Sequence, residues 1–185
     1  LQITLTKSLF KSHMLNSYHG IGHTVRVMWN AFLIAYTDKT ISNSILSSVL
    51  YASLIHDLGK NSDTEGEIHG ENSAILYKSK IEQSCSPEDA SSILEAVKYH
   101  SIDDSKTPST VRCSKIWEIL KDADALDRSR LPGRGCNPAF LRNKLFQLDD
   151  GKRILSIAKE LPSLTSDCTW DNPINNFINV IKSLK

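Results

Sequence analysis

The chain has 185 residues, of which 40% are hydrophobic and 23% charged, and its formal net charge is +1. Such a composition is typical of a globular chain with one sizeable core. The near-neutral charge does not favour nucleic acid as a partner, and no apolar run approaches the roughly 20 residues that span a bilayer. The four cysteines form no Cys-x-x-Cys pair, which favours free thiols and a cytoplasmic protein.

Apolar periodicity predicts helices along the chain and no strand. Ser42 or Asn43 is expected to cap the helix that ends at His56, and Ser86 followed by Pro87 is a strong helix start. The other expected helices are Leu5–Leu15, His23–Tyr36, His69–Glu82, Pro87–His100, Val111–Leu126, Phe140–Leu148, Gly151–Glu160 and Pro173–Leu184. We therefore expect an all-α fold, a single compact helical bundle in which residues 1–185 form one domain.

The stretch Ala52–Lys60 is the most informative part of the chain. Apolar residues cover nearly every side of the preceding helix, so that helix is expected to be buried. It ends in His56 and Asp57, a costly pair to bury unless the two groups find a partner such as a metal ion. Gly59 is expected to stop the helix. Taken alone, a His-Asp pair is better explained by a core histidine beside a solvent-facing acid, because two adjacent residues recur often by chance; the rest of the chain changes that weighting.

Three more histidines stand where a metal site would use them. His23 and His69 each open a predicted helix, and His100 ends another on the face set by Ile93 and Val97, so it should point inward. Neutral imidazole is a common ligand of iron, manganese and zinc. His19 is a less favoured candidate ligand than His23, and His13 is interpreted as an ordinary histidine without a role in the site.

A carboxylate should complete such a site. Asp124 continues the apolar stripe of Ile116 and Leu120, so it is the expected ligand. Asp122 falls on the polar face and is expected to be a surface acid. Asp127, three residues beyond Asp124, is a candidate to support a ligand from behind.

These residues together resemble the HD-domain superfamily of metal-dependent phosphohydrolases. The likeness rests on three motifs in order across about residues 19–130: Gly22-His23-Thr24-Val25-Arg26-Val27, Leu54-Ile55-His56-Asp57-Leu58-Gly59-Lys60 and Asp122-Ala123-Asp124-Ala125-Leu126-Asp127-Arg128. The Gly-Tyr-Pro signature of one phosphodiesterase branch is absent, as are the paired histidines of some two-metal branches.

The resemblance implies two divalent ions, without distinguishing Mn, Fe, Mg, Ni, Co and Zn. One ion would be held by His23, His56, Asp57 and Asp124. Asp57 would bridge to the second ion, which His69 and His100 would complete. Asp57 would thereby be the central catalytic residue, and a metal-activated water would cleave a phosphate ester or phosphodiester.

Basic residues near the motifs suggest how such a substrate would be held. Lys60 could stabilise developing charge, or it could be only a helix C-terminal cation. Arg128 and Arg130 could clamp a phosphate, or they could form a solvated basic turn. The expected partner is a phosphate-bearing small molecule of the nucleotide class.

Two other functions fit the same residues. One is an HD-fold di-iron oxygenase, since iron accepts the same donors. The other is a sensor that binds a nucleotide without cleaving it. The sequence leaves open the substrate, the metal, the oligomeric state and whether the chain is part of a longer protein.

Overall fold

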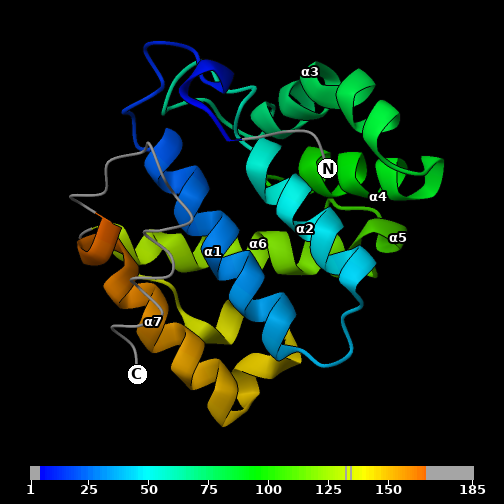
Figure 1. The fold of residues 1–185 in the computed structure, drawn as a ribbon. Coiled ribbons are helices and arrows are strands. Elements are labelled where there is room, and N and C mark those ends of the chain that lie inside the picture. Colours follow the sequence, from blue (N-terminus) through cyan, green and yellow to red (C-terminus); the bar gives the residue numbers. More distant parts are fainter. Residues whose placement is uncertain (1–4, 132, 134, 166–185) are drawn as a thin grey trace.

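The computed structural model describes residues 5–131, 133 and 135–165, and this part of the chain is all-helical, without strands. The α-helices are α1 (Ile21–Thr37), α2 (Asn43–Ile55), α3 (His69–Ser84), α4 (Pro87–Tyr99), α5 (Ser109–Arg112), α6 (Lys115–Asp127) and α7 (Asp149–Thr165). They pack into one helical bundle, as expected from the sequence (Figure 1). None of the described helices is long and apolar enough to cross a membrane.

Helix α2 lies at the centre of the bundle and packs against α1, α4 and α6. Its C-terminal half, from Ser48 onward, is almost completely buried, as the apolar pattern predicts. Ser42 caps the helix, because its hydroxyl accepts a hydrogen bond from the Ile45 amide. Helix α3 packs on α4, and α7 covers α1 and α6. The His-Asp pair at the end of α2 is therefore surrounded by the other helices.

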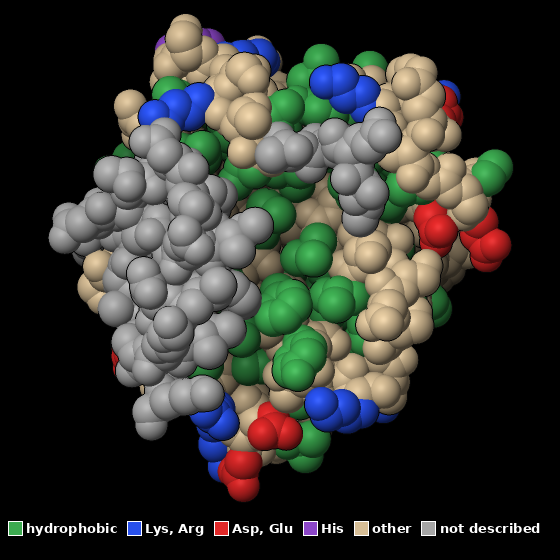
Figure 2. Space-filling model, viewed as in Figure 1, with side chains coloured by type: hydrophobic (Ala, Val, Ile, Leu, Met, Phe, Trp, Pro, Cys, Tyr) green, Lys and Arg blue, Asp and Glu red, His purple; other side chains and the backbone are tan. Residues whose placement is uncertain are grey.

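Hydrophobic side chains also reach the surface. Figure 2 shows a group of them on the face between α1 and α2. On α1 the rings of Phe32 and Tyr36 stack with centroids 5.5 Å apart, and Tyr36 is exposed.

Several predicted helices differ from the structure. Leu5–Leu15 contains only a short 3-10 helix, Lys7–Leu9, followed by turns. Val111–Leu126 is split between α5 and α6, and Ser114 precedes the first residue of α6. Phe140–Leu148 is replaced by the 3-10 helices Pro138–Phe140 and Lys144–Gln147. The predicted helix Pro173–Leu184 lies outside the described residues.

Two glycines permit close packing around the end of α2. Gly59 does not stop the helix: α2 ends at Ile55, and the φ angle of Gly59 is not positive. Its role is steric, because a Cβ here would lie 2.3 Å from the backbone nitrogen of Ser73 on α3. Gly70 lets α3 approach α4 in the same way, since its Cβ would lie 2.7 Å from the Val97 carbonyl oxygen. The segments that carry His56, His69 and His100 therefore pack at distances that leave no room for a side chain at Gly59 or Gly70.

Candidate metal centre

Four buried histidines and one buried aspartate converge at the end of α2. His23 lies in the first turn of α1, His56 and Asp57 follow α2, His69 opens α3 and His100 follows α4. Each side chain is almost inaccessible to solvent. They form two overlapping groups with metal-ligand spacing, one made of His23, His56 and Asp57 and the other of Asp57, His69 and His100. This cluster can hold a metal ion.

The first group surrounds one point in space. His23 Nε2 lies 3.1 Å from His56 Nε2 and 3.3 Å from Asp57 Oδ2, and His56 Nε2 lies 3.6 Å from the same oxygen. Two donor atoms each about 2.1 Å from one ion are about 3.0 Å apart at right angles and about 3.4 Å apart at the tetrahedral angle. The observed separations are therefore those of donors that share an ion.

The second group uses the other oxygen of Asp57. His69 Nε2 and His100 Nε2 lie 3.2 and 3.4 Å from Asp57 Oδ1, and 3.2 Å from each other. Oδ1 is buried and accepts no hydrogen bond with acceptable geometry. An anionic oxygen without a hydrogen-bond donor is costly to bury. A cation at this point would give Oδ1 the favourable partner that it lacks among the described protein groups. The two oxygens of Asp57 thus face two separate sets of imidazoles.

The far nitrogen of each imidazole fixes the orientation of the ring. The Nδ1 atoms of His56, His69 and His100 lie 2.7, 2.6 and 2.7 Å from the backbone carbonyl oxygens of Ser53, Gly66 and Val97. A carbonyl only accepts, so each Nδ1 carries the proton and each Nε2 can offer a lone pair to the cluster. His23 differs, because its Nδ1 lies 2.7 Å from a carboxylate oxygen of Asp127.

The charges within the cluster are strongly coupled. Burial lowers the pKa of His56 to about 4, so this imidazole is neutral near pH 7. Burial also acts to lower the pKa of His23, but its contacts with Asp127 and Asp57 outweigh that effect and raise the pKa to about 9. Burial would raise the pKa of Asp57, yet the surrounding imidazoles hold it well below its usual range. The bridging carboxylate is therefore ionised.

The three acids of α6 have three different environments. Asp124 lies beside the first group, with Oδ1 3.4 Å from His23 Nε2. Asp127 stands behind His23, as expected, and is held by the Arg26 guanidinium at 2.6 Å. Asp122 is not a surface acid: it is fully buried and accepts the backbone N–H groups of Arg142 and Asn143 at 2.8 to 3.0 Å. Its polar helix face is covered by a downstream loop.

The basic residues also separate by role. Arg130 is not a free phosphate clamp, because its guanidinium contacts Asp127 and donates to the Tyr18 carbonyl oxygen at 2.7 Å. Arg128 is exposed, and its side chain makes no hydrogen bond or ion pair with the described part of the chain. Lys60 is buried, with Nζ 3.3 Å from the Glu65 carbonyl oxygen and 3.2 Å from His69 Nδ1.

The cluster opens into a cavity of about 950 Å³. Lys60, Arg128 and Arg130 line it together with Asp57, His69, His100 and Asp124. A volume of this size accommodates a small-molecule ligand.

Sequence reasoning assigns no role to two residues of this site, Asp63 and Arg26. Asp63 is a loop residue that no sequence pattern distinguishes; it lines the cavity together with His19, and one of its carboxylate oxygens lies 2.8 Å from His19 Nδ1. Arg26 could have been noticed, because it lies three residues after His23 and so shares its helix face.

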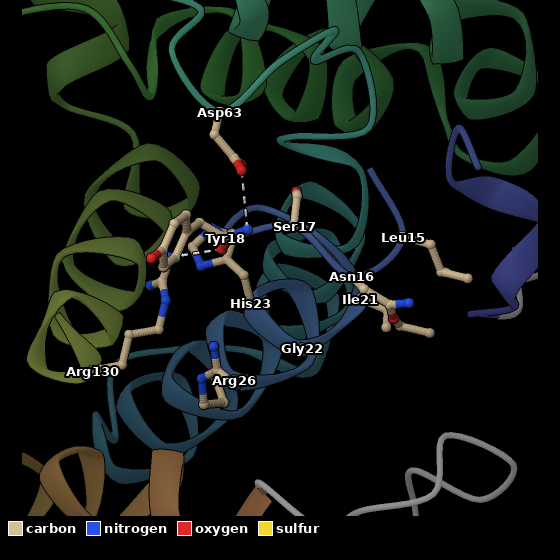
Figure 3. A pocket seen from close by; sticks show the side chains of 10 residues that line it. All are labelled: Leu15, Asn16, Ser17, Tyr18, Ile21, Gly22, His23, Arg26, Asp63 and Arg130. Carbon is tan, nitrogen blue, oxygen red and sulfur yellow. Dashed lines mark hydrogen bonds between the residues drawn. The ribbon is translucent and has the colours of Figure 1, made fainter. Parts of the chain in front are cut away.

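A second cavity of about 550 Å³ is lined by Ser17, Tyr18 and His23, and it shares Asp63 and Arg130 with the larger cavity (Figure 3). Arg26 and Arg130 flank it, but both guanidinium groups are already bound to Asp127. Asp63 accepts the Tyr18 amide across its upper edge. Because both arginines already bind Asp127, this cavity is a poorer binding site for an anion than the larger cavity, which Arg128 lines.

Comparison with known proteins gives no relative from which to transfer a function. No protein-family model matches the chain, no curated protein matches it, and no solved structure matches it.

Proposed function

We propose that this protein is a metal-dependent phosphohydrolase of the HD type that cleaves a phosphate ester of the nucleotide class at a two-metal site. The observation that carries the proposal is the bridging position of Asp57. One of its oxygens faces His23 and His56, and the other faces His69 and His100. A carboxylate shared in this way is the arrangement expected of two ions that act on one phosphate.

The protein residues around the cluster suit that chemistry. Two divalent ions would activate a water molecule and polarise the phosphoryl oxygens. Arg128, which has no partner in the described structure, is available to bind a phosphate oxygen through two parallel hydrogen bonds. Lys60 places a buried ammonium group at the wall of the cavity, where charge develops on the leaving oxygen. Asp124 would complete the first ion's ligands.

Metal content and phosphate release test the proposal together. Wild-type protein should bind two equivalents of Mn²⁺ and release phosphate from a panel of nucleotides and cyclic dinucleotides. His56→Ala or Asp57→Ala should abolish both metal binding and activity. His100→Ala should lose one ion and keep the other, because the first group is unchanged. His13→Ala is the matched control, since His13 is exposed and its side chain hydrogen-bonds, among the described residues, only to the Asn61 carbonyl oxygen. Full metal content in the Asp57 variant would overturn the proposal.

A di-iron oxygenase is the second candidate, favoured by a donor set of four imidazoles that iron accepts readily. Arg128, whose side chain has no partner among the described residues, lines the cavity and weighs toward hydrolysis. Oxygen uptake by Fe²⁺-loaded protein, in the absence of phosphate release, would favour the oxygenase. Nucleotide binding without either reaction would favour a sensor.

A further inference from the structure

We infer that Phe140 is a specificity-determining residue that stacks on the planar ring of the substrate, so that the large cavity binds a nucleoside phosphate with its phosphate at the metal centre and its base at Phe140. This inference rests on the proposed function, because it takes the metal centre as the phosphate-binding end of the cavity. It adds a ring-binding site at the other end of the cavity, formed by residues outside the His-Asp motifs.

Phe140 is the most exposed large hydrophobic residue of the described chain, with 76% of its surface accessible. It lines the same cavity as Asp57, His69 and Asp124. An aromatic ring left in water beside a binding cavity forgoes the gain of burial, and a ligand with a flat apolar face would recover it.

The backbone around Phe140 holds the ring in place. The Asn137 side chain caps the 3-10 helix Pro138–Phe140 by accepting the Ala139 amide at 3.0 Å. Two residues after Phe140, the Arg142 amide donates to the buried Asp122 carboxylate at 2.9 Å. The Arg142 guanidinium also binds Asp104 at 2.8 Å. The exposed ring is therefore carried by a segment anchored to the core, which lowers the entropy cost of stacking.

The charges of the cavity divide it into two ends. At the Phe140 end, Arg142 is bound to Asp104 and Asp122, and Lys121 is bound to Asp104 at 2.7 Å. Both of these described cations are therefore already neutralised by carboxylates. Arg128, which follows the expected ligand Asp124 by four residues and also lines the cavity, has no side-chain partner among the described residues. The anionic part of a ligand should therefore lie toward Arg128 and its uncharged ring toward Phe140.

Helix α6 connects the two ends. Lys121, Asp124, Ala125 and Arg128 all line the cavity and recur at helical spacing, so one face of α6 forms its floor. Lys121 precedes Asp124 by three residues, which is about 4.5 Å along the helix axis. Lys121, which shares Asp104 with Arg142, therefore marks the beginning of the Phe140 end about one helical turn from Asp124, the expected metal ligand.

The test compares adenosine 5′-monophosphate with ribose 5-phosphate, which has the same phosphate and sugar but no base. Both are titrated into metal-free protein and followed by ligand-observed NMR, so that no turnover occurs. Phe140→Ala should weaken binding of the nucleotide by about fivefold or more and leave ribose 5-phosphate unchanged, and Phe140→Trp should restore it. Leu148→Ala is the control, because Leu148 is also an exposed hydrophobic residue but does not line the cavity.

Equal binding of the two compounds by wild-type protein, or an unchanged ratio in Phe140→Ala, would overturn the inference. The proposed hydrolysis fails in a different way. If Mn²⁺-loaded wild-type protein releases no phosphate from either compound while Phe140→Ala still loses only nucleotide binding, the ring-binding site stands and the hydrolase is refuted.

Discussion

Substituting Gly70 by alanine should remove one metal ion while leaving the fold intact. Gly70 follows His69 on α3, and a Cβ at this position would lie 2.7 Å from the Val97 carbonyl oxygen and 2.8 Å from that of Lys98. Ordinary contact begins at 3.4 Å, so the two backbones would have to separate by roughly 0.6 to 0.7 Å. Val97 also carries the carbonyl that orients His100.

The two consequences of that shift differ in size. Overpacking costs about 1 to 3 kcal/mol, and the better helix propensity of alanine returns about 1 kcal/mol, so the free energy of unfolding should fall by no more than about 2 kcal/mol. Metal ligands tolerate displacements of only about 0.2 Å. The shift exceeds this tolerance about threefold, so the ion between His69 and His100 should be lost while the ion at His23 and His56 remains.

Elemental analysis after dialysis measures the ion count, and chemical denaturation measures the stability. Gly66→Ala is the matched control, because a Cβ at Gly66 meets nothing within 4 Å and its carbonyl still orients His69. Two tightly bound ions in the Gly70→Ala protein would refute the reasoning from packing to metal geometry.

The remaining predictions concern charges. Asp122→Ala should lower the free energy of unfolding by about 2 to 4 kcal/mol and leave metal binding unchanged. Asp124→Ala should leave the stability unchanged and weaken binding of the first ion. The opposite ranking would show that the roles of the two acids are exchanged. Arg128→Ala should raise the KM for the phosphate substrate, while Arg130→Ala should weaken metal binding, because it removes a partner of the carboxylate behind His23. Since the pKa of His23 is about 9 and an ion must displace its proton, metal affinity should rise about tenfold per pH unit from pH 7 to 9 and then level off; a flat profile in competition titrations would contradict this.

Much of the candidate site follows from local sequence patterns. The apolar residues Ile93 and Val97 correctly indicate that His100 points inward, because helical periodicity fixes which residues share a face. The same logic places Asp124 toward the cluster. It fails for Asp122, because the polar face of α6 is covered by Arg142 and Asn143, which arrive from about twenty residues downstream.

The structure also depends on contacts that no local pattern encodes. Gly59 looks like a helix stop in the sequence. In the structure a glycine is needed there because any side chain would collide with the backbone of Ser73 on α3. The segment around Phe140 has helical composition, yet it forms short 3-10 turns. Asp122 holds this segment, because it accepts the backbone amides of Arg142 and Asn143, just after Phe140. In both cases a residue distant in sequence decides the conformation.

The backbone carbonyls that orient three of the histidines each belong to the residue three positions earlier in the chain. His56, His69 and His100 therefore carry their alignment within a single turn of their own polypeptide, and they keep it when distant helices separate. His23 relies on Asp127, 104 residues away, so its alignment exists only once α1 and α6 have docked. An ion bound at His23 should thus slow the separation of these two helices. In hydrogen exchange, the amides of α6 should gain protection on metal loading, more than those of α3.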